Sequence, residues 1–413
     1  MSVQSAQILA IVGQGYVGLP LAMAAVDAGW SVIGIDNLET KVSQINSGLS
    51  PVEDISNAQL QAAISKGVYL ATTDYSKAAL ASVITICVPT PLDDKREPDL
   101  TLLRSAATGI APFISNETLI VSESTSYPGT LREIIIPIIN SLKSRDSSKV
   151  YFASAPERVN PGDPIWNQKN TPRLIGAIDS ESKTKALAFY ESICDAAISV
   201  STPEVAEAAK LLENTFRLVN IALVNEFTQL CSAAGINIHE VIDAASSKPY
   251  GFMPFRPGVG VGGHCIPVDP LYLTWWARQN GSKATFVESA DFINHAMPKY
   301  VAMRALSLVD SNIKSPKVLI LGVAYKPGVG DVRETPVSEL RDHLKSSGAD
   351  VAWHDPLVQI WEGSRPVDLD WKCDVAILAT KQPGMQFDQL IASGVQILDC
   401  TNSITGQIGV ISI

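Results

Sequence analysis

The sequence has too few positive charges to predict a polyanionic partner. Its 413 residues include 32 Lys and Arg against 42 Asp and Glu, which gives a formal net charge of -10 at pH 7. An acidic surface repels nucleic acids and anionic membranes at long range. We therefore expect neither a nucleic-acid nor a membrane partner. A phosphate-bearing ligand would have to be held by local donors, such as a glycine loop, a helix N-terminus or single Lys and Arg side chains.

Paired cysteines and long hydrophobic runs are also lacking. None of the six cysteines has C-x-x-C spacing, so the pattern predicts neither a metal site nor a thioredoxin-like pair. Scattered single cysteines are typical of a reducing cytoplasm, where most of them pack as small hydrophobic residues. Residues 8–26 are apolar, but glycines and a proline interrupt them and no basic segment precedes them. We therefore expect a cytoplasmic protein without a signal peptide or membrane span.

The same apolar stretch fits a nucleotide-binding turn. Residues 7–12 predict a buried strand, the glycine pattern of residues 13–18 follows at once, residues 19–28 predict a helix, and residues 31–35 predict a second strand. This order is typical of a dinucleotide-binding domain, whereas glycines alone would indicate only a turn.

Three glycines and an aspartate give this turn its expected chemistry. Gly13 permits the tight turn, Gly15 lets the backbone approach a pyrophosphate, and Gly18 allows close contact between helix and strand. Asp36 ends the second strand, where a carboxylate accepts the ribose hydroxyls and repels a 2′-phosphate. The predicted cofactor is therefore NAD and not NADP.

Two threonines follow later strands of the same domain. Residues 83–88 and 119–121 predict further strands, which end in loops that carry Thr90 and Thr125. In a parallel doubly wound sheet, ligands bind at the carboxyl ends of strands. Both threonines are therefore placed to contact the cofactor, although an isolated turn threonine is more often structural.

A long apolar helix is predicted over residues 201–234. Lys210, Asn214 and Arg217 fall on one face of it, at i, i+4 and i+7. Such side chains usually form a solvated stripe. The strongly apolar surroundings instead favour burial between domains or at a dimer interface.

A glycine-rich loop over residues 255–269 contains the candidate nucleophile. Cys265 follows several glycines, which let a backbone wrap closely around a ligand. His264 could lower the pKa of this thiol, and Asp269 follows four residues later. On these residues alone, a buried inert cysteine remains the alternative.

The C-terminal third predicts a second α/β unit, with Lys326 and Arg333 as possible phosphate ligands. The expected fold is therefore α/β, with two Rossmann-like doubly wound domains joined by a long central helix and helical region. The expected domains are an NAD-binding domain at residues 1–200, a central helical and dimerisation domain at 201–310, and a nucleotide-binding domain at 316–413.

Together these motifs show that the sequence resembles the UDP-glucose/GDP-mannose dehydrogenase family along essentially its whole length. Within the family it is most similar to the branch that acts on UDP-N-acetylhexosamines, UDP-N-acetylglucosamine in particular. Val268 stands where the glucose enzymes usually have Lys. The matching segments are residues 13–20, 88–91, 98–100, 124–130, 156–162, 206–214, 260–269 and 325–334.

The resemblance implies an NAD-dependent, four-electron oxidation of a sugar C6 alcohol to a carboxylate, through a thiohemiacetal and a thioester on Cys265. Lys210 and Asn214 would stabilise the oxyanion, Asp269 would help to remove the alcohol proton, and Glu157 would position or activate water. It also implies a homodimer packed through the long helix, with Arg256 reaching into the partner's sugar site.

The resemblance assigns three groups of site residues. The catalytic group is Cys265, Lys210, Asn214, Asp269, Glu157 and Thr125. The cofactor-binding group is Gly13, Gly15, Tyr16, Val17, Gly18, Asp36, Thr90, Thr125 and Arg333. The substrate-binding group is Glu157, Arg158, Val159, Asn160, Lys210, Asn214, Arg217, Phe255, Arg256, Gly260, Gly262, His264 and Lys326.

Three alternatives stay open. A UDP-glucose 6-dehydrogenase would use the same chemistry on another sugar. A two-electron β-hydroxyacid dehydrogenase would share the first domain and the long helix but would release one NADH per substrate. A non-catalytic NAD-binding or scaffold protein would turn over no UDP-sugar. The sugar epimer, UDP-N-acetylglucosamine or UDP-N-acetylmannosamine, is not fixed by these motifs.

Overall fold

The computed structural model describes residues 7–144, 149–159 and 165–413. The chain forms two compact units, the first containing Met1–Glu213 and Leu271–Asn280 and the second containing Asn214–Pro270 and Gly281–Ile413. The long helix α7, Pro203–Ala233, begins in the first unit and ends in the second. The three domain boundaries expected from the sequence stay a prediction.

An eight-stranded sheet, ordered β3-β2-β1-β4-β5-β6-β7-β8, forms the frame of the first unit. Neighbouring strands are parallel except for the antiparallel pair β6 and β7. Every side chain of β4, β5 and β6 is buried, as expected when both faces of a parallel sheet are covered. The strands are β1 (Ile8–Val12), β2 (Ser31–Ile35), β3 (Tyr69–Thr72), β4 (Val83–Ile86), β5 (Leu119–Ser122), β6 (Tyr151–Ser154), β7 (Arg173–Ala177) and β8 (Ala197–Val200).

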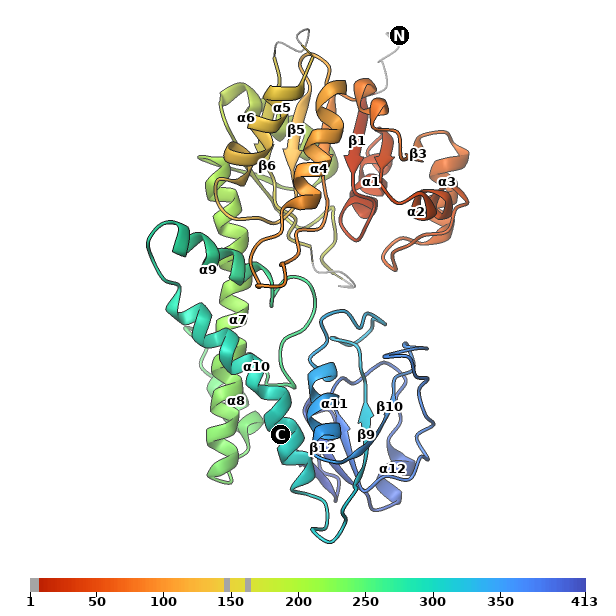
Figure 1. The fold of residues 1–413 in the computed structure, drawn as a ribbon, viewed down its shortest axis with the longest axis vertical. Helices are drawn as coiled ribbons and strands as arrows, with labels where there is room; N and C mark the ends of the chain where they lie inside the picture. Colours follow the sequence, from red (N-terminus) through yellow and green to blue (C-terminus); the bar gives the residue numbers. More distant parts are fainter. Residues whose placement is uncertain (1–6, 145–148, 160–164) are drawn as a thin grey trace. The chain divides into compact units, whose positions relative to one another are not determined.

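Helices alternate with these strands (Figure 1). They are α1 (Gly18–Asp27), α2 (Glu39–Asn46), α3 (Asn57–Ser65), α4 (Thr101–Ile110), α5 (Ile136–Leu142), α6 (Ser180–Ile193) and most of α9 (Asp269–Gln279). A π-helical turn, η3 (Leu131–Ile135), leads directly into α5. Pro137 explains this wider turn, because its ring and missing N–H disfavour regular α-helical hydrogen bonding there.

The strand order reverses at β1, which lies between β2 and β4. The chain leaves β1 towards β2 and β3, and then crosses past β1 to form β4 on the other side. In doubly wound sheets, ligands bind at such a reversal, outside the carboxyl ends of the strands. The glycine turn after β1 and the polar loops after β4 and β5 all follow strand ends at this edge.

The second unit contains a five-stranded parallel sheet, ordered β10-β9-β11-β12-β13. Helix α10 runs beside α11 (Figure 1), and buried side chains of both helices pack with those of β9 in one core. The strands are β9 (Lys317–Leu321), β10 (Asp350–His354), β11 (Val375–Leu378), β12 (Gln396–Asp399) and β13 (Val410–Ser412). The helices are α8 (Ile238–Ser246), α10 (Thr285–Leu306), α11 (Val337–Ser346) and α12 (Asp388–Ala392), besides the second part of α7.

The predicted fold class is confirmed. The structure contains a mostly parallel eight-stranded sheet, a parallel five-stranded sheet and a long central helix, and the strands expected near residues 7–12, 31–35, 83–88 and 119–121 are β1, β2, β4 and β5. The helix expected over residues 201–234 is the 31-residue α7.

Candidate active site

The glycine turn after β1 has the geometry that a dinucleotide requires. Gly13 has φ +96°, and a Cβ placed on it would lie 2.4 Å from the carbonyl oxygen of Cys87. A Cβ on Gly18 would lie 1.8 Å from the Gly13 oxygen. A Cβ on Gly15 would meet nothing within 4 Å. The protein's own packing therefore requires the first and third glycines, while the second faces open space that a pyrophosphate can approach.

Asp36 lies at the end of β2 and is 4% exposed. Its carboxylate accepts the Gln14 N–H at 2.9 Å and the Leu38 N–H at 3.1 Å. It also forms an ion pair of 2.8 Å with Lys41, the third residue of α2. The sequence analysis missed Lys41, because no spacing rule links this position to the aspartate. Together with the open Gly15, this carboxylate fits the pyrophosphate and ribose of NAD.

The loops after β4 and β5 are bonded to each other. The Thr90 hydroxyl donates to the Thr125 carbonyl oxygen at 2.7 Å. The Ser124 hydroxyl donates to the Val88 carbonyl oxygen at 2.7 Å. These two bonds fix the start of the Thr125 loop, which we define as residues 124–129, against the neighbouring Pro-Thr-Pro turn. Tyr16 and Val17, half-buried at the start of α1, complete the expected cofactor residues of this unit.

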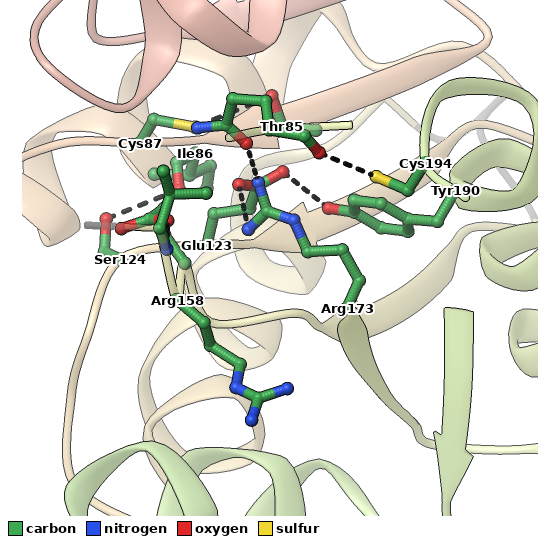
Figure 2. Close-up of polar contacts among 12 residues, drawn as sticks. Thr85, Ile86, Cys87, Glu123, Ser124, Arg158, Arg173, Tyr190 and Cys194 are labelled. Carbon is green, nitrogen blue, oxygen red and sulfur yellow. Dashed lines mark hydrogen bonds and ion pairs between the residues drawn. The ribbon is translucent and has the colours of Figure 1, made fainter. Parts of the chain in front are cut away.

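A buried ion pair lies directly before the Thr125 loop. Glu123 and Arg173 are both fully buried, with 3.2 Å between a carboxylate oxygen and a guanidinium nitrogen. The Tyr190 hydroxyl donates to the other carboxylate oxygen at 2.6 Å. Figure 2 shows the guanidinium and the hydroxyl both directed at Glu123. Burial raises the pKa of Glu123 and the adjacent cation lowers it, and we assign the ionised pair.

Glu157 and Arg158 follow β6 next to this pair. The Glu157 N–H donates to the Glu123 carbonyl oxygen at 3.2 Å, and its carboxylate accepts the Val159 N–H. The Arg158 guanidinium binds Glu213 of α7 at 2.6 and 3.1 Å and the Pro172 carbonyl oxygen at 2.9 Å. Arg158 is therefore held by the protein itself, through a partner that the motif did not indicate. Asn160 lies outside the described residues.

Helix α7 buries two of its three expected polar residues. Lys210 and Asn214 are buried on successive turns, whereas Arg217 is exposed. The Asn214 amide donates to the Asp269 carboxylate at 2.5 Å. The structure thus brings together two of the predicted catalytic residues that are far apart in the sequence.

Cys265 differs from the other cysteines by its exposure. It lies on the surface, while Cys373 is half-buried and the other four are buried. Only a thiolate is an effective nucleophile, and burial disfavours the thiolate. Burial raises the pKa of the Cys373 thiol to about 11, and it also raises the pKa of each of Cys87, Cys194 and Cys400.

The turn that carries Cys265 leads into α9. The Asp269 N–H donates to the Cys265 carbonyl oxygen at 2.9 Å. Burial and the cation of Arg333 lower the pKa of the preceding His264. A neutral imidazole offers no positive charge at neutral pH, so the expectation that His264 lowers the thiol pKa finds no support.

Three of the four glycines in this loop lie close to other parts of the protein, whereas a Cβ on Gly258 would meet nothing within 4 Å. A Cβ on Gly260 would lie 3.0 Å from the Pro336 side chain, and one on Gly262 would lie 2.8 Å from the Glu334 carbonyl oxygen. A Cβ on Gly263 would lie 2.9 Å from the Tyr325 ring. At these three positions the packing of the loop on the segment after β9 by itself requires small residues. The expectation that the loop also wraps around a ligand stays a prediction.

A cavity of about 360 Å³ lies in the second unit between this loop and the sheet. Lys326 and Lys381 line it with Tyr325, Gly260 and Thr380, so cations and hydroxyls could hold a nucleotide diphosphate there. The remaining expected residues have protein partners. Arg333 pairs with Asp331 at 2.6 Å, Arg256 pairs with Asp243, and Phe255 packs on Phe216 with ring centroids 5.8 Å apart.

In residues 7–144, 149–159 and 165–413, no helix is long and apolar enough to cross a membrane. The same residues contain no cluster of three His, Cys, Asp or Glu side chains able to hold a metal ion.

Family models match three successive segments of the chain. Residues 7–194 match the NAD binding domain of the UDP-glucose/GDP-mannose dehydrogenase family, residues 204–296 match its central domain, and residues 319–403 match its UDP binding domain. The NAD prediction is thereby confirmed.

Similar proteins carry names from the same family. UDP-N-acetyl-D-mannosamine dehydrogenase of Methanococcus vannielii is 36% identical over 87% of this chain and 82% of its own. UDP-N-acetyl-D-glucosamine 6-dehydrogenase of Pseudomonas aeruginosa is 33% identical over 85% of this chain and 83% of its own. The structure of UDP-D-ManNAc dehydrogenase from Pyrococcus horikoshii superimposes with a TM-score of 0.88 and 31% identity, covering 98% of each chain.

Proposed function

The chain belongs to the UDP-glucose/GDP-mannose dehydrogenase family, and from that premise we propose that it oxidises the C6 alcohol of a UDP-N-acetylhexosamine to the carboxylate. The observation that carries the proposal is Cys265, the exposed thiol in a turn that leads directly to Asp269. The names of the similar proteins support the substrate class.

Cys265 gives the proposed reaction its second oxidation. NAD, when bound, supplies the hydride acceptor for both oxidations. An aldehyde at C6 has no tetrahedral carbon to lose hydride until a nucleophile adds, and the Cys265 thiolate forms that bond as a thiohemiacetal. Loss of hydride leaves a thioester. Water then cleaves the carbon–sulfur bond, so that the alcohol, two NAD and one water give the carboxylate, two NADH and three protons.

Buried polar groups on α7 are suited to the charge that develops at C6. We propose that the ammonium of Lys210 and the amide of Asn214 stabilise the oxyanion, because fixed donors in a buried place need no reorganisation. Asp269 holds the Asn214 amide, which has a second N–H for the oxyanion. Asp269 also helps to remove the alcohol proton, through water or Lys210. Glu157 positions the hydrolytic water.

The substrate experiment compares three sugars. UDP-N-acetylglucosamine, UDP-N-acetylmannosamine and UDP-glucose are each supplied with NAD, and NADH is counted per sugar consumed. We expect two NADH with at least one N-acetylated sugar and a weaker response to UDP-glucose. One NADH per sugar would favour two-electron chemistry, preference for UDP-glucose would reassign the substrate, and no turnover would remove the catalytic proposal.

We also propose a homodimer that packs through α7. One side of this helix is exposed and apolar at Leu212, Phe216, Leu223, Phe227 and Leu230. The spacings of four, seven, four and three residues place these side chains in one stripe, which a second copy of α7 would cover. Arg256 would then contribute to the partner's sugar site. Sedimentation should give a dimer at micromolar concentration, and a fully active monomer would contradict the proposal.

A further inference from the structure

A buried carboxyl group on α7 bonds to the backbone beside the Thr125 loop. Glu207 is 2% exposed and lies one helical turn before Lys210. One of its oxygens accepts the Gly129 N–H at 2.7 Å, and the other accepts the Leu131 N–H at 3.1 Å. No motif of the sequence analysis assigned a role to this residue.

These two bonds cap a helix that has no cap of its own. The helix that starts with η3 follows Thr130, its N-cap residue, whose side chain makes no capping hydrogen bond. The first N–H groups of a helix need acceptors, and a carboxylate is favoured there by the helix dipole. Gly129 presents its N–H from φ +103°, a conformation that side chains rarely adopt. Glu207 therefore supplies from α7 what the local sequence lacks.

The same bonds fix the far end of the Thr125 loop. The start of that loop is already held by the Ser124 and Thr90 hydroxyls. With Glu207 at the other end, the backbone around Thr125 is anchored to the helix that carries Lys210. The Glu207 side chain thus links the position of the Thr125 loop to the helix that carries the Lys210 amine.

We propose that Glu207 is a positioning residue, which holds the Thr125 loop in register with Lys210 for cofactor binding and hydride transfer. The inference rests on the proposed function for its kinetic consequence, but its effect on NAD binding does not depend on the identity of the sugar. Both carboxylate oxygens are needed because each accepts a different N–H.

Glu204 offers a matched control. It lies one turn earlier on α7 and forms an ion pair of 2.7 Å with Arg132 of the same capped helix. Glu204→Gln removes a contact between the same two helices without touching the backbone of the Thr125 loop. Any effect of loosening the two helices in general should appear in both variants.

The experiment compares Glu207→Gln with Glu204→Gln in the full-length protein. An amide has a single acceptor oxygen and places an NH₂ against one of the two N–H groups. At about pH 9, where the Glu207 side chain is ionised, we expect Glu207→Gln to weaken NAD binding about tenfold by calorimetry and to lower kcat about tenfold, with KM for the UDP-sugar within about twofold of wild type. Glu204→Gln should stay within about twofold of wild type in all three quantities.

Three outcomes would overturn the inference: a folded Glu207→Gln with unchanged NAD affinity and kcat, an equal loss in Glu204→Gln, or a loss confined to the KM of the UDP-sugar. If Glu207→Gln does not fold, Glu207→Asp, which keeps the charge but is one methylene shorter, decides by the same criteria. Wild-type protein that binds NAD but oxidises none of the three sugars would remove the proposed function, while the calorimetric comparison would still test Glu207.

Discussion

The two parallel sheets begin with nearly the same turn. Gly13 after β1 and Gly322 after β9 both have positive φ, and each donates its N–H at 2.8 Å to the last carbonyl oxygen of the neighbouring second strand. That second strand is followed by an aspartate in both cases, Asp36 or Asp355. In each sheet the aspartate accepts backbone N–H groups of the turn.

The sheets differ in the segment after the glycine. In the first, α1 begins five residues later at Gly18 and the turn leaves space at Gly15. In the second, α11 begins only at Val337, and Gln382 bonds both to the Asp355 carboxylate at 3.3 Å and to the intervening loop. The glycine after the first strand and the aspartate after the second are therefore structural features that both sheets share. An open helix N-terminus beside them is the feature that distinguishes a dinucleotide site.

The largest effect on activity is expected from Cys265. It lies in neither glycine turn but in the loop of residues 255–269, which packs on the segment after β9. Cys265→Ser should retain substrate binding and lower four-electron turnover by at least about 10³-fold, because a serine hydroxyl adds poorly and leaves a less reactive ester. NADH stoichiometry and mass spectrometry of the protein would detect a stalled first oxidation or an acyl adduct. Cys373→Ser is the control and should keep its activity. Near-normal turnover of Cys265→Ser with two NADH per sugar would exclude the covalent route.

The next prediction compares Gly322, which the protein's own packing requires, with Gly15, which is expected to lie against the cofactor. A Cβ on Gly322 would lie 1.8 Å from the Thr380 carbonyl oxygen at φ +80°, so Gly322→Ala should lower the free energy of unfolding by about 3 kcal/mol. Gly15→Ala should change it by less than about 0.5 kcal/mol, because its Cβ would meet no protein atom. It should nevertheless weaken NAD binding strongly. Urea denaturation and calorimetry separate the two effects, and equal destabilisation by both substitutions would refute the contrast.

The two aspartates allow a finer test. Asp36→Asn should raise the NADP-to-NAD ratio of kcat/KM about tenfold, because it removes a repulsive charge and releases Lys41 towards a 2′-phosphate. Asp355→Asn should leave cofactor preference unchanged but lower stability by about 1–3 kcal/mol, since it weakens acceptors for buried N–H groups. A change of cofactor preference in Asp355→Asn would show that the second acid also touches the cofactor.

The last prediction concerns the pH dependence of stability that arises from a third carboxyl group, Glu207, which accepts backbone N–H groups. Burial raises the pKa of Glu207 to about 8, against the opposing effect of its two backbone bonds. A folded-state pKa above the unfolded value stabilises the protein below about pH 4.5, and this contribution is lost as the pH rises towards 8. The stability of wild type relative to Glu207→Gln should therefore fall between pH 5 and pH 8.5 in urea titrations. If the stability difference between wild type and Glu207→Gln stayed constant or rose over this pH range, the raised pKa of Glu207 would be contradicted.

Local patterns determined much of the first unit and the cofactor. Strand β1, the glycine turn and α1 follow one another within 20 residues, so periodicity and glycine spacing were enough to predict them and NAD. The apolar length of α7 predicted its extent for the same reason. The antiparallel pairing of β6 and β7 was not predictable, because the direction of a short strand depends on the path of the chain between them.

The contacts that organise the site were decided by the tertiary structure. Glu123 meets Arg173 across 50 residues, Asn214 meets Asp269 across 55, and Glu207 meets Gly129 across 78. No sequence spacing sets such distances. A carboxyl group looks the same in the sequence whether it faces water, caps a helix or pairs with a buried cation. Only the fold determines how far each carboxyl group is removed from water and which protein donor takes the place of that water. The loss of water and the new donor together determine the charge and the role of the carboxyl group.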